Sequence, residues 1–259
     1  MSAPRRLALL LAYDGRGFHG FQRQAGFPSV QEELERAWSA VTGERAVVHG
    51  SGRTDTGVHA WGQVAHLDTV AKLPVERVAP ALNAYLPNEV VVRAAAAAAP
   101  QFHARASAIG KRYVYLLAVG SQRPLLRAGW VGWERAASLD LAAMRAGARH
   151  LLGRQDFSAF AAAGRTSRTS VRTLRCAHLR RVRGGLMLAF EADGFLYKQV
   201  RNMVGALQEV GRGRRAPEWI AALLASGDRR KAAATAPAVG LYLWRVRYAA
   251  DPFAGRCRH

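Results

Sequence analysis

Apolar segments of strand length alternate along the chain with segments whose apolar residues repeat at helical spacing. The first, LALLLAY at residues 7–13, runs directly into Asp14 and Gly15, a turn dipeptide. It is too short to cross a membrane and carries no small-residue cleavage site, so a buried strand is expected rather than a targeting segment. The alternation predicts an α/β fold of the α+β type.

The expected elements follow from periodicity and from end signals. Ser29 and Glu32 form a capping box, so a helix is expected to start at Ser29. Further helices are expected over about 75–86, 140–152, 197–210 and from Pro217 to Gly227. Strands are expected near 6–13, 45–49, 62–68, 89–98, 111–120, 174–182, 186–192 and 241–248.

A faint internal echo favours two similar halves. LALLLAYDGRGFHGFQ near the start is similar to LMLAFEADGFLYKQ at 186–199, where an apolar strand again runs into Asp-Gly, Phe and Gln. A length of 259 residues fits one large domain or two of ordinary size, and we expect two, at residues 1–107 and 108–259. Each should carry a mainly antiparallel sheet flanked by helices, with a cleft between them.

The charge points to a polyanionic partner. The chain holds 38 Lys and Arg against 18 Asp and Glu, a net charge of +20. Residues 1–110 hold 11 basic and 9 acidic residues, whereas residues 111–259 hold 27 and 9. Such a field attracts RNA, DNA or an anionic membrane surface. Two distant cysteines, Cys176 and Cys257, fit neither a disulfide framework nor a zinc site and favour a reducing cytoplasm.

One carboxylate stands out in the stretch HGSGRTDTGVHAWGQVAHLDT at residues 49–69. Asp55 lies in a glycine-rich loop, two residues after Arg53. Glycines permit a close approach by a substrate, and a nearby guanidinium would keep the carboxylate ionised, as a nucleophile or a base requires. The plainer interpretation is a turn aspartate that bonds its own backbone, and the loop by itself leaves both open.

Six motifs decide between these interpretations. GRTDTGVHAWGQVAH resembles the catalytic motif of the tRNA pseudouridine synthase A family, and five other segments resemble that family in the same order. They are AYDGRGFHGFQRQ with SVQEELERA, NAYLPNEVVV, FHARASAIGKRYVY, FLYKQVRNMVGALQEVGRG and APAVGLYLWRVRY.

The resemblance implies an activity. The chain is expected to adopt the pseudouridine synthase fold and to convert uridine to pseudouridine at positions 38, 39 and 40 of the tRNA anticodon stem-loop. Family members act as cytoplasmic homodimers on tRNA, without cofactor or metal, and the sequence shows no metal-ligand cluster. No membrane or DNA partner is expected.

The resemblance also assigns roles to residues. Asp55 is the expected catalytic carboxylate, and Arg201 is expected to pair with it. Tyr113 is expected to stack on the flipped uridine or to donate a proton, and Leu243 to line the pocket. The expected tRNA contacts lie at three places in the chain: Arg53; Phe102, His103, Ala104, Arg105 and Ala106; and Ser167, Arg168 and Thr169.

Two rival functions fit the sequence less well. A protein that only binds or folds tRNA would not need the set Asp55, Tyr113 and Arg201. A nuclease would require several carboxylates around metal ions or a pair of histidines placed as acid and base, and neither pattern is present in the sequence.

Overall fold

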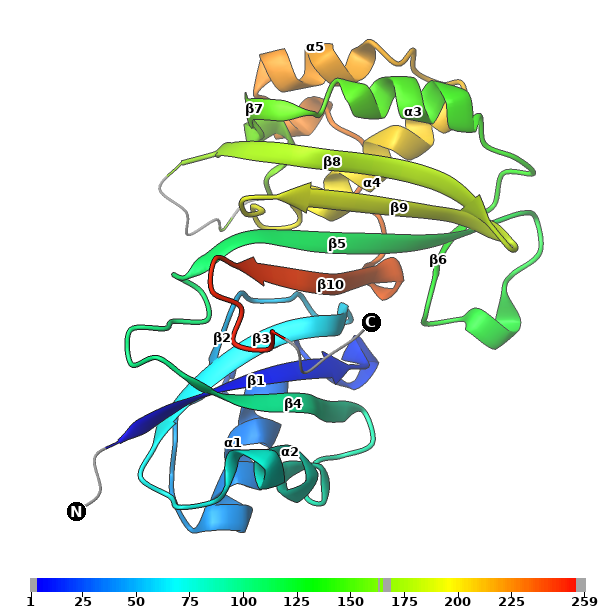
Figure 1. Cartoon of the computed structure of the whole chain (residues 1–259). Helices are drawn as coiled ribbons and strands as arrows, with labels where there is room; N and C mark the ends of the chain where they lie inside the picture. The colour runs from blue at the N-terminus through cyan, green and yellow to red at the C-terminus, as the bar shows by residue number, and fades with distance from the viewer. Residues whose placement is uncertain (1–3, 163, 165–168, 255–259) are drawn as a thin grey trace. The chain divides into compact units, whose positions relative to one another are not determined.

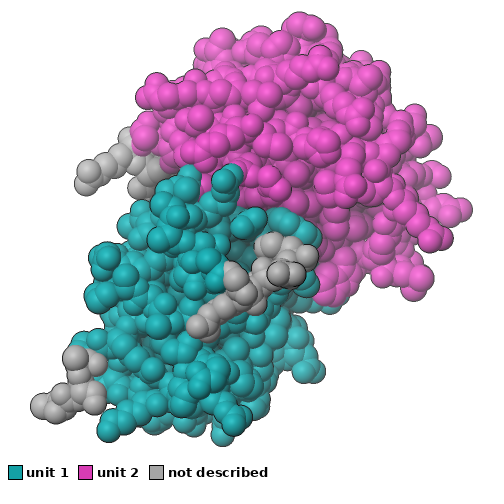
Figure 2. Space-filling view, in the orientation of Figure 1, with its two compact units in different colours: residues 1–109, 243–259 teal, residues 110–242 magenta. Residues whose placement is uncertain are grey.

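The chain forms two compact units. The computed structural model describes residues 4–162, 164 and 169–254. Unit 1 comprises residues 1–109 and 243–259, and unit 2 comprises residues 110–242 (Figure 2). The division expected after residue 107 assigns residues 243–259 to the second half, whereas they belong to unit 1; the division into folding domains stays a prediction.

Unit 1 is a mainly antiparallel sheet with two helices. Its strands run in the order β4-β1-β3-β10, with β2 added to β3 (Figure 1). Its elements are β1 (Arg5–Tyr13), α1 (Val30–Thr42), β2 (His49–Gly50), β3 (His59–Thr69), α2 (Val75–Asn83), β4 (Val90–Ala98) and most of β10 (Leu241–Tyr248). The predicted first strand is confirmed, and residues 7–13 are all buried.

The helix expected at Ser29 is confirmed, and its ends follow the sequence signals. The Ser29 Oγ accepts a hydrogen bond from the Glu32 backbone N–H at 3.3 Å, and the helix ends at Gly43 with φ of 72°. Its buried face includes Leu34 and Trp38. The second helix ends at Asn83, earlier than expected, shortly before Pro87.

The strand expected at 45–49 is wrong, because only His49 and Gly50 pair with β3. The backbone N–H of Val48 donates instead to the Glu35 carboxylate on α1, at 3.0 Å. A side chain therefore satisfies the backbone that a strand neighbour would otherwise satisfy.

In its described residues, unit 2 combines five β-strands with three helices. Its strands run in the order β5-β9-β8-β7, antiparallel throughout, with β6 parallel to β5 (Figure 1). Its elements are most of β5 (Ala108–Val119), β6 (Gly132–Glu134), α3 (Leu141–Arg149), β7 (Gly153–Asp156), β8 (Val171–Val182), β9 (Gly185–Ala192), α4 (Gln199–Gly211) and α5 (Trp219–Ser226). Its fully buried side chains include Tyr115, Phe157, Phe160 and Phe190.

Two short strands of unit 2 escaped the sequence analysis. β6 and β7 span three and four residues, too few for a period-two pattern to appear. The helix expected over 140–152 ends at Arg149, and Gly153, with φ of 94°, starts β7. Both units nevertheless combine a mainly antiparallel sheet with helices, so the expected α+β class is confirmed.

Within the described part of the chain, none of the helices has the length and apolar composition that a membrane crossing requires.

Candidate active site

Asp55 lies in the loop between β2 and β3 of unit 1. Its side chain is partly exposed, and Arg53 and Thr56 on either side of it are exposed. The Val58 N–H donates to the Asp55 carbonyl oxygen at 3.1 Å, which closes a turn in which Gly57 has φ of 77°. A glycine adopts this φ without strain, so the turn fixes the backbone of Asp55.

Buried hydrogen bonds to β1 and β3 fix the Asp55 loop. The hydroxyl groups of Tyr13 and Thr54 lie 2.9 Å apart, and Tyr13 is inside the core of unit 1. The Gln63 side chain on β3 accepts from the Ser51 hydroxyl at 2.6 Å and donates to the Gly52 carbonyl oxygen at 3.0 Å. Burial raises the pKa of Tyr13 to about 12, so its hydroxyl stays protonated at neutral pH.

The loop that follows β1 packs directly on the Asp55 loop. A Cβ on Gly20 would lie 2.3 Å from the Thr54 carbonyl oxygen, and the φ of Gly20 is 97°. The Phe21 N–H donates to that same oxygen at 3.4 Å, and the Gly57 N–H donates to the Phe18 carbonyl oxygen at 3.4 Å. The Asp55 loop is therefore held between the sheet and residues 18–21.

Asp14 directly follows β1 and contacts His59, the first residue of β3. The Asp14 carboxylate accepts from the backbone and guanidinium of Arg16, and it lies 3.2 Å from the Nδ1 of buried His59. Burial opposes ionisation, but hydrogen bonds from Arg16 and the charge of His59 outweigh it and hold the pKa of Asp14 below its usual range. Asp14 therefore stays ionised and anchors the start of residues 14–28.

The segment 102–106 divides into buried and accessible residues. Phe102 and Ala104 are buried, and Ala104 binds unit 1 at both ends, through its N–H to His66 Nδ1 at 3.2 Å and its carbonyl oxygen to the Tyr248 hydroxyl at 2.6 Å. Arg105 and Ala106 are exposed, and their N–H groups donate to His103 Nδ1 at 3.1 and 3.2 Å. The hydrogen bonds of Ala104 therefore hold this segment on unit 1, while Arg105 remains exposed.

Leu243 lies on β10, and its side chain is buried. It belongs to unit 1, as do Arg53, Asp55 and residues 102–106.

Tyr113 and Arg201 belong to unit 2. Tyr113 lies on β5, almost completely buried, and packs edge to face on Phe195 with ring centres 5.3 Å apart. Arg201 lies in the first turn of α4, and its Nε donates to the Ala236 carbonyl oxygen at 2.7 Å. The Ala236 N–H donates back to the Arg201 carbonyl oxygen at 3.1 Å. Two reciprocal hydrogen bonds therefore join the first turn of α4 to residue 236.

The third expected tRNA segment is described only in part. Thr169 is exposed, and its Oγ1 accepts from the Val171 N–H at 3.1 Å, just before β8. Ser167 and Arg168 lie outside the described residues.

Comparison with known proteins matches most of the chain. A sequence model for tRNA pseudouridine synthase matches residues 10–105 and 148–249. The tRNA pseudouridine synthase A of Thiobacillus denitrificans is 44% identical over 95% of this chain and 94% of its own length. Those of Caulobacter vibrioides (strain NA1000 / CB15N) and Geobacillus kaustophilus are 45% and 43% identical, over 94% of this chain and 98% and 95% of their own lengths.

This chain belongs to the tRNA pseudouridine synthase family. The expected enzyme class, an isomerase that modifies tRNA, is thereby confirmed. The matched segments contain Asp55, Arg201 and Leu243, whereas Tyr113 lies between them. Among the described residues, no group of three or more His, Cys, Asp or Glu side chains is placed to hold a metal ion.

Sequence reasoning missed the residues that position the Asp55 loop of this pseudouridine synthase. Tyr13 reads as the last apolar residue of a strand, and Gln63 as one polar residue in another. A signal for Gln63 was present, because a glutamine between apolar neighbours in a buried strand must find hydrogen-bond partners. Nothing in the sequence pairs Tyr13 with Thr54, which is 41 residues away.

Proposed function

We propose that this chain converts uridine to pseudouridine at positions 38, 39 and 40 of the tRNA anticodon stem-loop, with Asp55 as the nucleophile. The observation that carries this proposal is a family match that includes a loop built to present a single carboxylate. The Asp55 backbone is fixed by the turn to Val58, and the residue is partly exposed.

The reaction requires one bond to break and one to form at the same sugar carbon. The C1′–N1 bond breaks, the freed uracil turns, and C1′ joins C5, which then loses its hydrogen. The Asp55 carboxylate can attack C1′, attack the uracil ring or remove the 2′ proton, and each route needs it ionised. An arginine paired with it would keep it so, and Arg201 is our candidate.

The target base must leave the helical stack before it can react. Unstacking costs a few kcal/mol, which an aromatic face in the pocket can offset. Tyr113 is the candidate for that face, because Phe195 holds its ring at a fixed angle. Leu243 is the candidate for an apolar wall.

The basic surface supports binding of tRNA. We assign phosphate or sugar contacts to Arg53, His103, Arg105 and Ala106, which are wholly or partly exposed, and to Thr169. Phe102 and Ala104 would act by shaping this segment, because their side chains are buried. Ser167 and Arg168 complete the proposed set. Such contacts position RNA without reading its sequence. We further propose a cytoplasmic homodimer that binds the anticodon stem-loop.

Position mapping tests the specificity. Purified enzyme is incubated in EDTA with a tRNA that has uridine at 38, 39 and 40, and with three variants that each replace one of these by cytidine. Pseudouridine is located by mass spectrometry of nuclease fragments. The proposal expects pseudouridine only at the uridines that remain among the three. Product elsewhere in the tRNA would contradict the assigned positions, and tight binding without any product would favour a tRNA-binding protein.

A further inference from the structure

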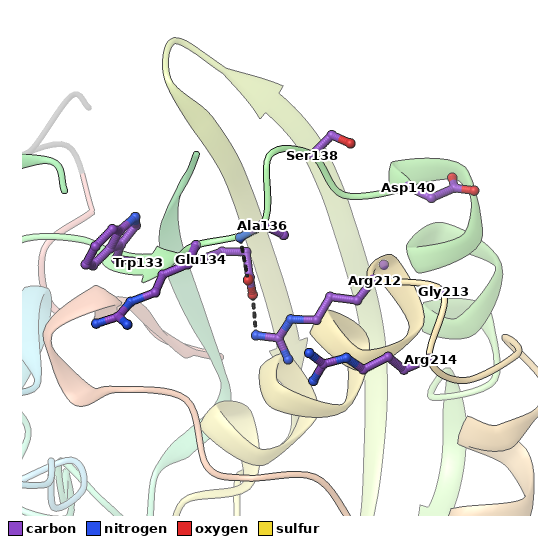
Figure 3. Close-up of a pocket in the computed structure, with 10 residues that line it drawn as sticks. Trp133, Glu134, Ala136, Ser138, Asp140, Arg212, Gly213 and Arg214 are labelled. Carbon is purple, nitrogen blue, oxygen red and sulfur yellow. Dashed lines mark hydrogen bonds and ion pairs between the residues drawn. The ribbon is translucent and has the colours of Figure 1, made fainter. Parts of the chain in front are cut away.

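A concave site lies wholly within unit 2. It is a pocket with a volume of about 860 Å³ between the segment 133–140, which includes the end of β6, and residues 211–214 at the end of α4 (Figure 3). Three arginines line it: Arg135, Arg212 and Arg214.

The floor of the pocket is a buried, neutralised acid. Glu134 is 3% exposed, and its carboxylate accepts from the Arg212 guanidinium, from the Gln208 side chain at 2.8 Å and from the Ala136 N–H at 3.0 Å. Burial opposes ionisation, but these hydrogen bonds together hold the pKa of Glu134 below its usual range. The negative charge of Glu134 is therefore compensated by its ion pair with Arg212, which weakens its repulsion of an anion.

The end of α4 fixes the arginines of the rim. The Arg214 N–H donates to the Glu209 carbonyl oxygen at 3.0 Å and the Gly213 N–H to the Val210 carbonyl oxygen at 2.9 Å, with Gly213 at φ of 72°. These bonds form a Schellman motif, which places Arg212 and Arg214 on either side of the glycine. Figure 3 shows both side chains extending the same way, toward Glu134.

Two guanidinium groups keep donors for a ligand. The Arg214 side chain is 66% exposed, and its ion pair is a 3.5 Å contact with Glu209, which also binds Arg212. Arg135 is exposed and lies 4.9 Å from the centre of the Trp133 ring, and it has no acidic partner among the described residues. The Trp133 indole N–H is bound to the Gly120 carbonyl oxygen at 2.9 Å, so its ring is held in place.

The remaining acid of the lining is engaged locally. Asp140 caps α3, where its carboxylate accepts from the Ala143 N–H at 2.9 Å and faces the positive end of the helix dipole. The exposed part of the lining therefore holds Arg135 and Arg214 together with Asp140, whose carboxylate is engaged by the start of α3.

We propose that this pocket binds phosphate groups. Guanidinium groups match phosphate oxygens in pairs. The phosphates come from tRNA held in the active site, a source that rests on the proposed function, or from a free molecule that carries a phosphate. Residues 133–140 lie outside both segments that the family model matches.

The test compares two pairs of exposed arginines in the full-length enzyme. The double variant Arg135→Gln/Arg214→Gln removes the two rim charges. The matched control Arg149→Gln/Arg154→Gln removes two exposed charges elsewhere in unit 2. Binding of tRNA is measured from 50 to 300 mM salt, and binding of pyrophosphate and AMP by thermal shift. For RNA phosphates, the slope of log Kd against log salt should fall by about 1–2 in the rim variant and by less in the control.

Each outcome has one meaning. A reduced slope that Arg135→Lys/Arg214→Lys restores supports tRNA phosphate as the ligand. An unchanged slope with loss of pyrophosphate or AMP binding supports a free ligand. Salt slopes and anion binding that equal those of the control overturn the proposal. Because binding is measured without turnover, an enzyme that binds tRNA but makes no pseudouridine fails the proposed function and leaves this test intact.

Discussion

The Tyr13 hydroxyl lies 2.9 Å from the Thr54 Oγ1, and Thr54 is the residue immediately before Asp55. Tyr13 ends β1, and Thr54 lies in the loop before β3, so the bond joins the core of unit 1 to the loop that carries the carboxylate. Both side chains are buried, and the bond is therefore shielded from water.

Loss of this bond should lower turnover more than substrate affinity. In Tyr13→Phe the Asp55 loop loses a fixed point, and a small displacement of a reacting group can reduce kcat roughly tenfold. Stability should fall by about 1 kcal/mol. The measurement is kcat and KM from initial rates over a range of tRNA concentrations, together with urea unfolding.

Tyr248→Phe is the matched control for that substitution. It removes a buried hydroxyl that donates to the Ala104 carbonyl oxygen at 2.6 Å, in the same unit. A similar loss of stability is expected, with any kinetic effect in KM, because Ala104 belongs to the proposed tRNA segment. An equal drop of kcat in both variants would show that Tyr13 acts only through overall stability.

Gly20 should tolerate no side chain. In Gly20→Ala the Cβ would meet the Thr54 carbonyl oxygen, and the backbone conformation is strained as well. Gly26→Ala has a similar φ of 79° with open space around the new Cβ, so it isolates the conformational cost of roughly 1–2 kcal/mol. Gly20→Ala should lose about 1–3 kcal/mol more and most of its activity. Equal thermal stabilities of the two variants would contradict the close packing of residues 18–21 on the Asp55 loop.

The pair of Glu134 and Arg212 should make stability depend on pH. Because the fold lowers the pKa of Glu134, its contribution is present above the unfolded pKa, near 4.5, and is lost as pH falls through the folded pKa. Arg212→Gln should cost about 2–4 kcal/mol at pH 7, and this cost should shrink as pH falls through the folded pKa of Glu134, which lies below its usual range. Urea unfolding over a series of pH values from 7 downward measures this.

Arg230→Gln serves as the comparison for Arg212. Its ion pair with Asp228 is on the surface, and the Arg230 side chain is 89% exposed, so its loss should not change stability measurably. A pH-independent effect of Arg212→Gln would show that packing, and not charge, accounts for its contribution.

His66 should destabilise unit 1 in acid. Burial lowers the pKa of His66 to about 4, with further lowering by His103 and His49. Its folded pKa is below the unfolded value of 6.5, so the unfolded chain takes up the proton first and stability is lost as pH falls from 6.5 to about 4. His66→Gln should flatten the decrease of Tm over this range, whereas His178→Gln, at an exposed position on β8, should not. Identical pH profiles for wild type and His66→Gln would refute a buried neutral histidine.

The sequence predicted those elements whose signals are local. Ser29 and Gly43 mark the two ends of α1, because a helix cap acts within a few residues. The apolar residues of β1 likewise indicate a strand without reference to a distant partner. The strand expected at 45–49 was wrong because Glu35, on a helix earlier in the chain, satisfies Val48. β6 and β7 were missed because their length leaves no period to detect.

The candidate site divides in the same way. Asp55 could be found because its motif is contiguous and resembles that of a family. The bond between Tyr13 and Thr54 and the approach of Gly20 to Thr54 could not be found, because both depend on how distant segments pack. The pairing of Asp55 with Arg201 stays a prediction.

Release of tritium from tRNA labelled at C5 of uridine tests the central claim most directly. Joining C1′ to C5 must expel the hydrogen of C5, so release reports the new carbon–carbon bond. Wild type and Asp55→Asn are compared side by side, with tRNA binding measured for both. We predict release by the wild type alone, with nearly equal tRNA affinity. Release by Asp55→Asn at a comparable rate would contradict the assignment of Asp55 as the nucleophile.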